Sequence, residues 1–593
     1  MLLLDNADNP VMESTAKTGK KLRKKPGLIK ELGFYELLII GIAGSLGNGA
    51  LFGTIDMVAG AGPSAILAFV FGAFIYLLVT FTYVELSRVY PEAGGPTRYS
   101  IYTHGRWTNL INSMADILWY LFIPPIEVVA IIIGSGFFFP GLFVTSSGFP
   151  TFNGGLLGVV LLLTFIPINY FGIKQFGKTS KWIGIVKLVF YLAMVIGLIG
   201  FVFDAKNLFK YGFFTPHTPI VSFLSIMPLA MYDFGATRVI PDLAEETKHK
   251  ADVTKAMIFT VVIESLIYIG VAFAIILGFH WSSFGVKPGD FAALTSAHAL
   301  VGLNPFFVFS QRSGFYWIFI AALVTGFLAP YVTGYIYAGS GSRVMMAIGR
   351  SGFINKRLQS INLKHSIPLV ALVSFTMIGA IIVFLSAPIP SIYSFIDDAS
   401  AAGYLGLAVT PIALMVSRRQ GVTKETDKFR GMWIIAPLSV GLSSLIPFWA
   451  GWPSEPYAVF LMFIGAAMIG AISKVKIGAR NAIWYVVYIL FITLMTLIGS
   501  DGFAGTITSL NFASVGVHYT FALSLPASWG TLIPFDYATL LIFAISMAVF
   551  YPWGVLSGFK AQFDHPEFTR PVLDDLGIGS GAVAENVQIA EEL

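Results

Sequence analysis

The chain has 593 residues, a formal net charge of +5 and no cysteine, which excludes disulfides, thiolate catalysis and cysteine-bound metals. Hydrophobic residues make up 56% of the chain and charged residues only 12%, with a mean hydropathy of +0.77. Soluble domains carry about twice that share of charged residues. The composition therefore excludes a soluble globular protein as the expected class.

Long apolar segments recur between residues 37 and 555, and short polar connections separate them. Each segment is about 18–30 residues long, and a helix needs roughly 20 apolar residues to cross the hydrocarbon core of a bilayer. We therefore predict an all-α integral membrane protein in a lipid bilayer, with about 14 transmembrane helices.

The basic residues predict how these helices are oriented. Most Lys and Arg residues lie in the two terminal tails and in alternate loops, whereas the intervening loops hold few. Since cytoplasmic loops are enriched in Lys and Arg, we expect the cell (cytoplasmic) membrane as the location, with both termini cytoplasmic. The positive net charge then reflects topology and gives no reason to expect a nucleic-acid partner.

The two ends of the chain are polar. Residues 1–33 are basic and have no apolar core, so we expect a cytoplasmic N-terminal tail and not a cleaved signal. Residues 557–593 are expected to form a cytoplasmic C-terminal tail.

The first apolar segment is interrupted by glycines. Five of them fall between Gly41 and Gly53, and each costs a helix about 1 kcal/mol relative to alanine. The pattern predicts a discontinuous helix 1. The alternative is a glycine face that allows close helix packing.

The sixth apolar segment is interrupted by polar residues. It places Asp233, Gly235 and Arg238 at membrane depth. The two interrupted segments stand five spans apart and so enter from opposite sides of the membrane. Broken helices at corresponding positions in two halves indicate an inverted-repeat transporter with a site near the midplane.

Four local motifs resemble those of the amino acid–polyamine–organocation superfamily of permeases. They are residues 47–49, residues 91–96 following Glu85, residues 242–248, and residues 342–352 followed by residues 367–368. Their order and spacing extend over more than half of the chain. The resemblance is to the amino acid permease branch of that superfamily.

The resemblance implies a fold and a domain organisation. The core is expected to be a five-plus-five inverted repeat, with helices 1–5 in residues 34–203 and helices 6–10 in residues 204–417. Additional helices 11–14 would occupy residues 418–556. The resemblance also implies secondary active transport of an amino acid by alternating access, with the proton as the expected coupling ion and no cofactor.

The two breaks predict a site for a zwitterion, built mostly from backbone. Freed amides at a half-helix N-terminus carry partial positive charge and suit a carboxylate, whereas freed carbonyls suit an ammonium group. The amides are those of Gly47, Asn48 and Gly49. The carbonyls are those of Gly44, Ser45 and Leu46 in the first segment and those near Tyr232, Asp233, Phe234 and Gly235 in the sixth.

The resemblance assigns gating roles to two tyrosines. Tyr232 falls where related permeases place an aromatic lid over the substrate, and Tyr337 aligns with an aromatic floor. The alternative for both is ordinary packing, because aromatic residues make up 15% of the chain.

Asp233 and Arg238 are intramembrane charges, which are expensive and normally face the interior of a helix bundle. They are open to two interpretations. The pair could brace the unwound segment as an internal ion pair. Alternatively, Asp233 could bind a cationic group of the substrate, with Arg238 in a supporting role.

Lys187 is expected roughly 10 Å inside the fifth span. Related permeases have a lysine there that fills the position of a sodium ion in sodium-driven relatives. The resemblance therefore implies proton coupling through Lys187, with Thr333 and carbonyls of helix 1 as neighbours. The alternative is a lysine that extends to the headgroups.

Five further acidic residues lie in spans, and the sequence does not rank their roles. They are Asp116, Glu127, Glu264, Asp397 and Asp398.

Three other functions remain as alternatives. An importer of amines or polyamines, or a substrate exchanger, would use the same fold. A membrane enzyme would need a nucleophile–base set or metal ligands, and the eight histidines show no paired spacing. A channel would need a repeated filter sequence, which is not visible. The sequence leaves the particular substrate and the oligomeric state open.

Overall fold

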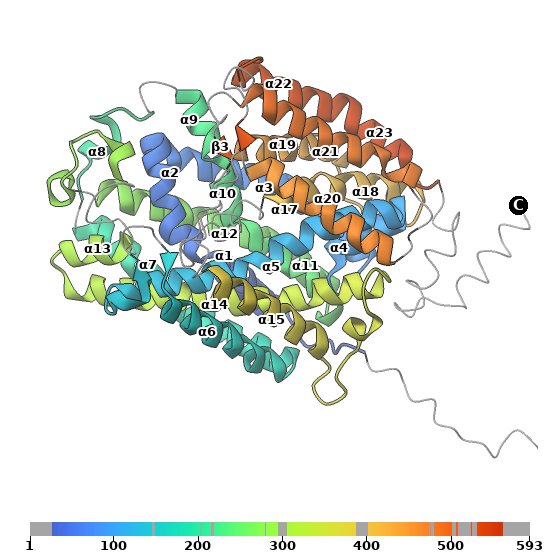
Figure 1. Cartoon of the computed structure of the whole chain (residues 1–593), viewed down its shortest axis with the longest axis horizontal. Helices are drawn as coiled ribbons and strands as arrows, with labels where there is room; N and C mark the ends of the chain where they lie inside the picture. The colour runs from blue at the N-terminus through green and yellow to red at the C-terminus, as the bar shows by residue number, and fades with distance from the viewer. Residues whose placement is uncertain are drawn as a thin grey trace, which may run out of the picture.

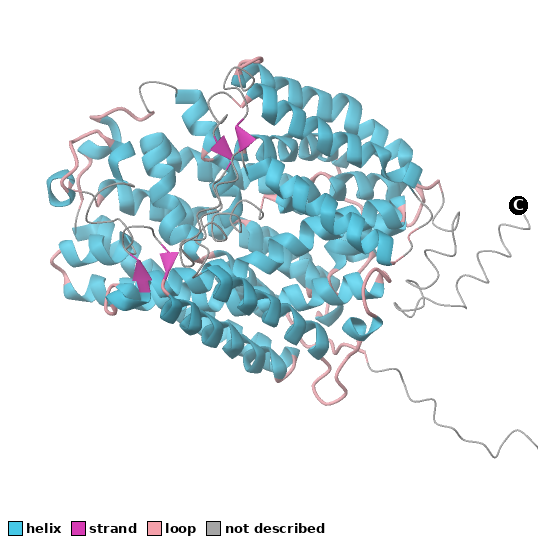
Figure 2. Ribbon diagram, in the orientation of Figure 1, coloured by secondary structure: helices cyan, strands magenta, loops and turns pink. Residues whose placement is uncertain are grey.

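The computed structural model is helical almost throughout (Figure 2). It describes residues 27–144, 149–201, 203–214, 219–278, 280–294, 305–386, 401–452, 454–473, 475, 479–500, 506–507, 523–524 and 531–560. The strands within these residues form two short antiparallel pairs, β1 (Phe143–Val144) with β2 (Phe149–Pro150) and β3 (Thr506–Ile507) with β4 (Leu523–Ser524). The predicted all-α class is confirmed.

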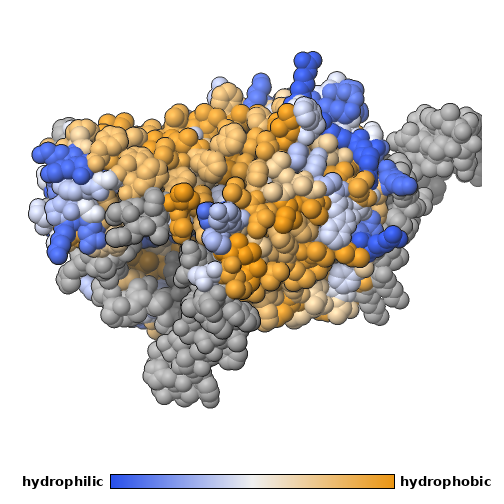
Figure 3. Space-filling model, turned by 90° about the horizontal axis from the view of Figure 1, so that it is seen from above, coloured by the Kyte–Doolittle hydropathy of each residue, from blue (hydrophilic) through white to orange (hydrophobic). Residues whose placement is uncertain are grey.

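Eleven helices in the described part of the chain are long and apolar enough to cross a membrane. The number is twelve if the bent pair Ile220–Asp233 and Gly235–Asp242 counts as one span. A broad hydrophobic band crosses the face seen in Figure 3, and hydrophilic residues gather toward its two ends. The protein is therefore a multi-pass membrane protein.

The predicted count of fourteen differs from this number for physical reasons. The stretch Gly49–Val89 counts once, but its 41 residues would extend about 60 Å as one helix, twice the hydrocarbon thickness. Gly62 interrupts it with φ +64°, a conformation that side chains disfavour. The apolar helix Phe34–Ser45 is too short to count, and the predicted tenth span falls partly outside the described residues. Fourteen spans therefore stay a prediction.

The elements of the first predicted repeat follow one another from the start of the described chain. They are α1 (Phe34–Ser45), η1 (Gly49–Gly53), α2 (Thr54–Ala61), η2 (Gly62–Ser64), α3 (Ala65–Val89), α4 (Gly95–His104), α5 (Arg106–Gly136), η3 (Pro140–Leu142), α6 (Phe152–Tyr170) and α7 (Ile173–Phe201). The η1 element is a short π-helix.

The elements of the second predicted repeat are more often interrupted. They are α8 (Lys206–Phe209), α9 (Pro219–Ser225), α10 (Met227–Asp233), η4 (Gly235–Arg238), α11 (Val239–Asp242), η5 (Ala244–Glu246), α12 (Lys250–Leu277), η6 (Trp281–Phe284), η7 (Phe291–Leu294), α13 (Pro305–Arg312), α14 (Tyr316–Arg350), η8 (Lys356–Gln359), α15 (Leu369–Ser386), α17 (Ala402–Leu407) and α18 (Val409–Arg419).

The remaining elements belong to the predicted additional helices. They are η9 (Glu425–Asp427), α19 (Met432–Ala450), α20 (Ser454–Ile472), α21 (Ala479–Gly499), α22 (Phe535–Ile545), η11 (Ser546–Phe550) and α23 (Tyr551–Ser557). In Figure 1 these helices lie along one side of the molecule, and α6 and α15 lie along the opposite side. α19 packs on α3, and α20 packs on α5.

The short helix α1 is enclosed by longer helices. It packs against α7, α12 and α14, and it also contacts η4. Seven of its residues are buried, including Gly44 and Ser45 at its C-terminal end. This packing brings the interruption that follows α1 beside the interruption that follows α10.

Candidate functional site

The break after α1 is present but shorter than predicted. The helix continues through Ser45, Leu46 and Gly47 form a bend, and helical structure resumes at Asn48. The Gly47 amide donates to the Ser45 carbonyl at 2.7 Å. Gly44 and Ser45 are therefore helical residues, and part of the freed backbone is satisfied locally.

The second break adjoins the first. α10 ends at Asp233, η4 begins at Gly235, and the arms on either side are bent by 41°. A Cβ atom at Gly44 would lie 2.9 Å from the Ala236 Cβ. A Cβ atom at Gly49 would meet the Asp233 carboxylate and lie 3.1 Å from the Tyr232 ring. The absence of side chains at these glycines lets the two broken segments approach.

A cavity of about 270 Å³ begins at these breaks. Its described lining residues are Asn48, Gly49, Phe52, Gly53, Asp56, Ile126, Ser225, Pro228, Leu229, Tyr232, Ala401, Tyr404, Ala450 and Ser454. Of the predicted binding residues, Asn48, Gly49 and Tyr232 therefore face this cavity. The other predicted residues are not among its described lining residues.

Aromatic residues surround the cavity near Tyr232. The Trp119 ring lies 5.3 Å from Tyr232 and 5.4 Å from Tyr404, between centroids. The Tyr404 hydroxyl donates to the Pro228 carbonyl at 2.7 Å. The sequence analysis missed Trp119 and Tyr404, since nothing local distinguishes them in an aromatic-rich chain.

Tyr337 lies deeper than Tyr232. It is buried, and its ring centroid is 5.5 Å from that of Tyr120. A Cβ atom at Gly235 would lie 3.2 Å from the Tyr337 hydroxyl. Phe234 is fully buried against Tyr76 and Tyr268. These contacts are those of packed aromatics beneath the break, and gating by Tyr337 stays a prediction.

Glu127 of α5 occupies part of the predicted carboxylate site. The Asn48 amide donates to both of its carboxylate oxygens, at 2.9 and 3.2 Å. A Cβ atom at Gly47 would lie 2.8 Å from the Glu127 carboxyl carbon. In this conformation a carboxylate of the protein binds the Asn48 amide, and binding of a substrate carboxylate there stays a prediction.

Lys187 of α7 links α1 to α14. Its ammonium donates to the Ala43 carbonyl at 2.6 Å, the Ala329 carbonyl at 2.9 Å and the Thr333 hydroxyl at 3.1 Å. Three acceptors match the three N–H donors of a charged lysine. The side chain is fully buried, so the headgroup alternative is wrong and the predicted neighbours are confirmed. Proton coupling by Lys187 stays a prediction.

Arg238 of η4 pairs with Asp116 of α5, and it also donates to the Gly403 carbonyl at 3.4 Å. The alternative of an ion pair between Asp233 and Arg238 is therefore wrong. Their side chains separate because α5 supplies a closer carboxylate to Arg238. Asp233 is left with no hydrogen-bond partner for either carboxyl oxygen among the described residues.

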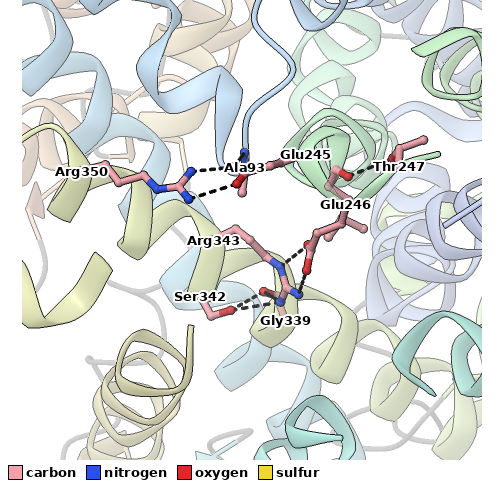
Figure 4. A network of polar contacts seen from close by, with 9 residues as sticks. Ala93, Glu245, Glu246, Thr247, Gly339, Ser342, Arg343 and Arg350 are labelled. Carbon is pink, nitrogen blue, oxygen red and sulfur yellow. Dashed lines mark hydrogen bonds and ion pairs between the residues drawn. The ribbon is translucent and has the colours of Figure 1, made fainter. Parts of the chain in front are cut away.

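A cluster of ion pairs, which we call the arginine–glutamate network, joins η5 to the end of α14 (Figure 4). Arg343 binds Glu246 through two hydrogen bonds of 2.8 Å. Arg350 binds Glu245 at 2.6 and 3.2 Å, and the Ala93 amide donates to Glu245 at 2.9 Å. The network therefore ties together three segments that are far apart in the sequence.

Glu245 is ionised in this arrangement. Burial raises the pKa of its carboxyl, but the Arg350 guanidinium and the Ala93 amide outweigh burial and hold the pKa below its usual value. Two further ion pairs lie in neighbouring segments, Glu92 with Arg98 at 2.7 Å and Glu85 with Arg418 at 2.5 Å.

The cavity and the network lie on opposite sides of the breaks. The cavity is lined by residues after the first break and by residues before the second. The network lies beyond the second break, where the Glu246 carbonyl accepts from the Leu32 amide just before α1. The broken helices are thus bordered by a cavity on one side and by ion-paired segments on the other.

No group of three or more His, Cys, Asp or Glu residues within the described ranges could hold a metal ion. Asp397 and Asp398, which the sequence analysis left unranked, lie outside the described residues.

A multi-pass helical protein with a cavity at two adjoining helix breaks has the features of a membrane transporter with discontinuous helices. The model of the amino acid permease family matches residues 32–456. The chain belongs to the amino acid permease family, and it is a transporter and not an enzyme. This confirms the resemblance predicted from the four motifs.

Two relatives from Bacillus subtilis (strain 168) are similar over nearly the whole chain. An aspartate-proton symporter is 26% identical over 498 residues, covering 81% of this chain and 92% of the relative. The glutamate/serine transporter AimA is 26% identical over 555 residues, covering 90% and 95%. A crystal structure of a manganese transporter from Eremococcus coleocola aligns with a TM-score of 0.47 and 14% identity, covering 79% of this chain and 99% of that one.

Proposed function

We propose that this permease carries an amino acid across the cytoplasmic membrane together with protons, by alternating access around the two helix breaks. The cavity at Asn48, Gly49 and Tyr232 is the observation that carries the proposal. It begins at the point where both helices are interrupted, and the arginine–glutamate network is proposed to close the other side by joining η5 to α14. Both termini are proposed to be cytoplasmic, because most Lys and Arg residues lie in the two tails and in alternate loops.

The substrate is proposed to bind as a zwitterion at the breaks. Backbone at Gly47, Asn48 and Gly49 would receive the carboxylate after Glu127 moves away from the Asn48 amide. The Asp233 carboxylate, which adjoins Gly49, would receive the ammonium group. Tyr232 would cover the substrate from the cavity side.

Proton coupling is proposed to involve Lys187. Its charged form cross-links α1 and α14 through the Ala43 and Ala329 carbonyls. Loss of the proton would remove a donor and weaken this link, which would allow the two helices to move apart. The name of the aspartate-proton symporter among the relatives agrees with this choice of ion.

The repeat boundaries predicted from the sequence are retained as part of the proposal. Residues 34–203 and 204–417 would form the two halves that move relative to each other, and residues 418–556 would support them. The broken elements α1–η1 and α10–η4 fall at the start of each half.

An amine importer or an exchanger is the second candidate. Glu127 already binds the Asn48 amide, and Asp233 has no cation partner among the described residues. Two carboxyl groups, Glu127 and Asp233, therefore lie beside the breaks, and they favour a substrate with a cationic group. This candidate differs from the first in requiring no substrate carboxylate.

A ligand screen by thermal stability tests the proposed function. Purified protein is heated with each of the twenty amino acids and with putrescine and spermidine. A ligand stabilises the native state by RT ln(1 + [L]/Kd), so we expect amino acids, and not the amines, to raise Tm. A rise with the amines alone would contradict the first candidate and support the second.

Gly49→Val tests the placement of the site. The added side chain would meet the Asp233 carboxylate and crowd the Tyr232 ring, so we expect uptake to be abolished and the protein to remain folded. Gly200→Val is the matched control, because a Cβ atom at Gly200 meets nothing within 4 Å. Normal uptake by well-expressed Gly49→Val protein would show that the substrate binds elsewhere.

A further inference from the structure

Two buried carboxyl groups beside the breaks lack a cation. Asp233 ends α10 and is 2% exposed, and Glu264 lies within α12 and is 0% exposed. None of their four carboxyl oxygens has a hydrogen-bond partner among the described residues. The two groups are close enough to interact electrostatically. We call them the carboxyl pair.

A buried hydroxyl is directed at this pair. Ser45, the last residue of α1, is 6% exposed, and its hydroxyl adjoins the Glu264 carboxyl. The hydroxyl completes no hydrogen bond of good geometry with any described residue. An unsatisfied hydroxyl next to unsatisfied carboxyl oxygens indicates a polar site with unmet hydrogen-bonding capacity.

The other groups that face Glu264 do not supply a positive charge. Tyr76 of α3, Tyr268 of α12 and Tyr337 of α14 interact with it electrostatically, and tyrosines are neutral at physiological pH. Asp233 also interacts with Tyr191 of α7 and with the Glu127 carboxyl of α5, which adds no positive charge either. The two buried cations on adjacent elements are held by other partners. They are Lys187, on two carbonyls and Thr333, and Arg238, on Asp116.

An isolated ionised carboxylate is strongly disfavoured in a water-free interior. Two neighbouring carboxylates disfavour each other's ionisation further. A metal ion would neutralise this charge only with several coordinating ligands, and the described residues offer no such group. A proton neutralises a carboxylate without further ligands. The proton is thus the ligand that the pair can accept as it stands.

We propose that Glu264 is a second proton site of this permease, which acts together with Asp233 and is separate from Lys187. The inference rests on the proposed function. Protonation of Glu264 removes its share of the repulsion on Asp233, on which Glu127 also acts, so that Asp233 ionises as it binds the ammonium group of the substrate. By linkage, a proton on Glu264 and an amino acid at Asp233 promote each other's binding.

The positions of the two groups suit this division of roles. Asp233 adjoins Gly49 and follows Tyr232, both of which line the cavity. Neither carboxyl is among the described lining residues, and Glu264 interacts with Asp233 and Ser45. Asp233 is therefore the carboxyl of the pair that adjoins lining residues, and the substrate would reach it first and affect Glu264 through it.

The test compares Glu264→Gln, which imitates the protonated side chain, with the wild type. Purified proteins are titrated with L-aspartate, L-glutamate and L-serine at acid, neutral and alkaline pH, and the proton-to-amino-acid ratio is measured in proteoliposomes. We expect wild-type affinity to fall as pH rises. We expect Glu264→Gln to bind with the same affinity at every pH, to retain amino acid exchange, and to carry one proton fewer per amino acid.

Glu455→Gln is the matched control. Glu455 is also a fully buried intramembrane carboxyl, but it accepts a hydrogen bond from Thr493 at 2.8 Å between α20 and α21. Its removal should leave the pH dependence and the ratio unchanged.

Three results would overturn the proposal. The first is a Glu264→Gln protein whose amino acid affinity depends on pH as in the wild type and whose proton-to-amino-acid ratio is unchanged. The second is loss of amino acid binding by folded Glu264→Gln protein. The third is a wild-type affinity for the amino acid that changes with sodium concentration at constant pH. A wild-type protein that binds none of the amino acids would instead contradict the proposed function itself.

Discussion

The arginine–glutamate network and the carboxyl pair are both buried groups of charged residues, but they differ in how the charge is satisfied. In the network, each carboxylate accepts two hydrogen bonds from a guanidinium. In the pair, no described cation approaches either carboxyl. Burying an unpaired charge costs roughly several kcal/mol. The network can therefore remain ionised as a fixed structural link, whereas the pair needs a mobile ligand.

Lys187 lies between these two cases. Its side chain is fully buried, like the Arg343–Glu246 pair of the network, but its ammonium donates to neutral oxygens and not to a carboxylate. The acceptors in direct contact with it are neutral, and the Glu127 carboxyl interacts with it electrostatically. A group of this kind can hold helices together in one protonation state and release them in the other.

The largest expected effect is that of Lys187→Ala. Alanine removes the ammonium group that links α1 to α14. Because no proton then controls this link, we expect accumulation in proteoliposomes to be lost. Binding measured by thermal shift should survive, since the cavity at Gly49 and Tyr232 does not include Lys187.

Lys181→Ala is the control for that change. Lys181 lies on the same helix, but it pairs with Glu36 at 2.8 Å and both side chains are partly exposed. An exposed pair contributes about 0–1 kcal/mol, so uptake should be close to that of the wild type. Full proton-driven accumulation by Lys187→Ala would refute the role of Lys187.

A smaller effect, on stability, is expected for the network. Arg343→Gln or Glu246→Gln alone would leave the other charge buried without its partner, at a cost of about 3–5 kcal/mol. The double substitution should cost much less than the sum of the two single ones. The measurement is the free energy of unfolding, or Tm, of the purified variants. If the two single effects add up to that of the double substitution, Arg343 and Glu246 are not energetically coupled. The proposed difference between the arginine–glutamate network and the carboxyl pair would then be incorrect.

The smallest effects separate the partners of Arg238. The cycle of Arg238→Gln with Asp116→Asn should give a coupling energy of about 0.5–3 kcal/mol, because the two side chains are in contact. The cycle of Arg238→Gln with Asp233→Asn should give a value near zero. A large coupling in the second cycle would return Asp233 to a structural role and would remove it from the carboxyl pair.

Local sequence patterns predicted the helix breaks well. The glycines between residues 41 and 53 and the polar residues at 233–238 are enough to predict both interruptions without knowledge of tertiary contacts. The neighbours of Lys187 followed from the resemblance, and the structure confirms Thr333 and the Ala43 carbonyl. Such predictions succeed because they depend on local backbone preference or on a motif with fixed spacing.

The partners of the charges could not be predicted in the same way. Asp116 is 122 residues from Arg238, and Glu127 is 79 residues from Asn48. Both contacts depend on how α5 packs beside the broken segments, which a single sequence does not reveal. The span count was limited for another reason. The apolar pattern does not show that the first span is divided after the short helix α1, and the predicted tenth span falls partly outside the described residues.

The most direct test of the account is amino acid uptake by reconstituted protein under imposed ion gradients. Proteoliposomes are loaded so that either a proton gradient or a sodium gradient is the only driving force, with L-aspartate, L-glutamate or L-serine outside. The account predicts accumulation against the concentration gradient when the outside is acidic, with no change when sodium is replaced by potassium. Accumulation driven by a sodium gradient at constant pH would contradict it.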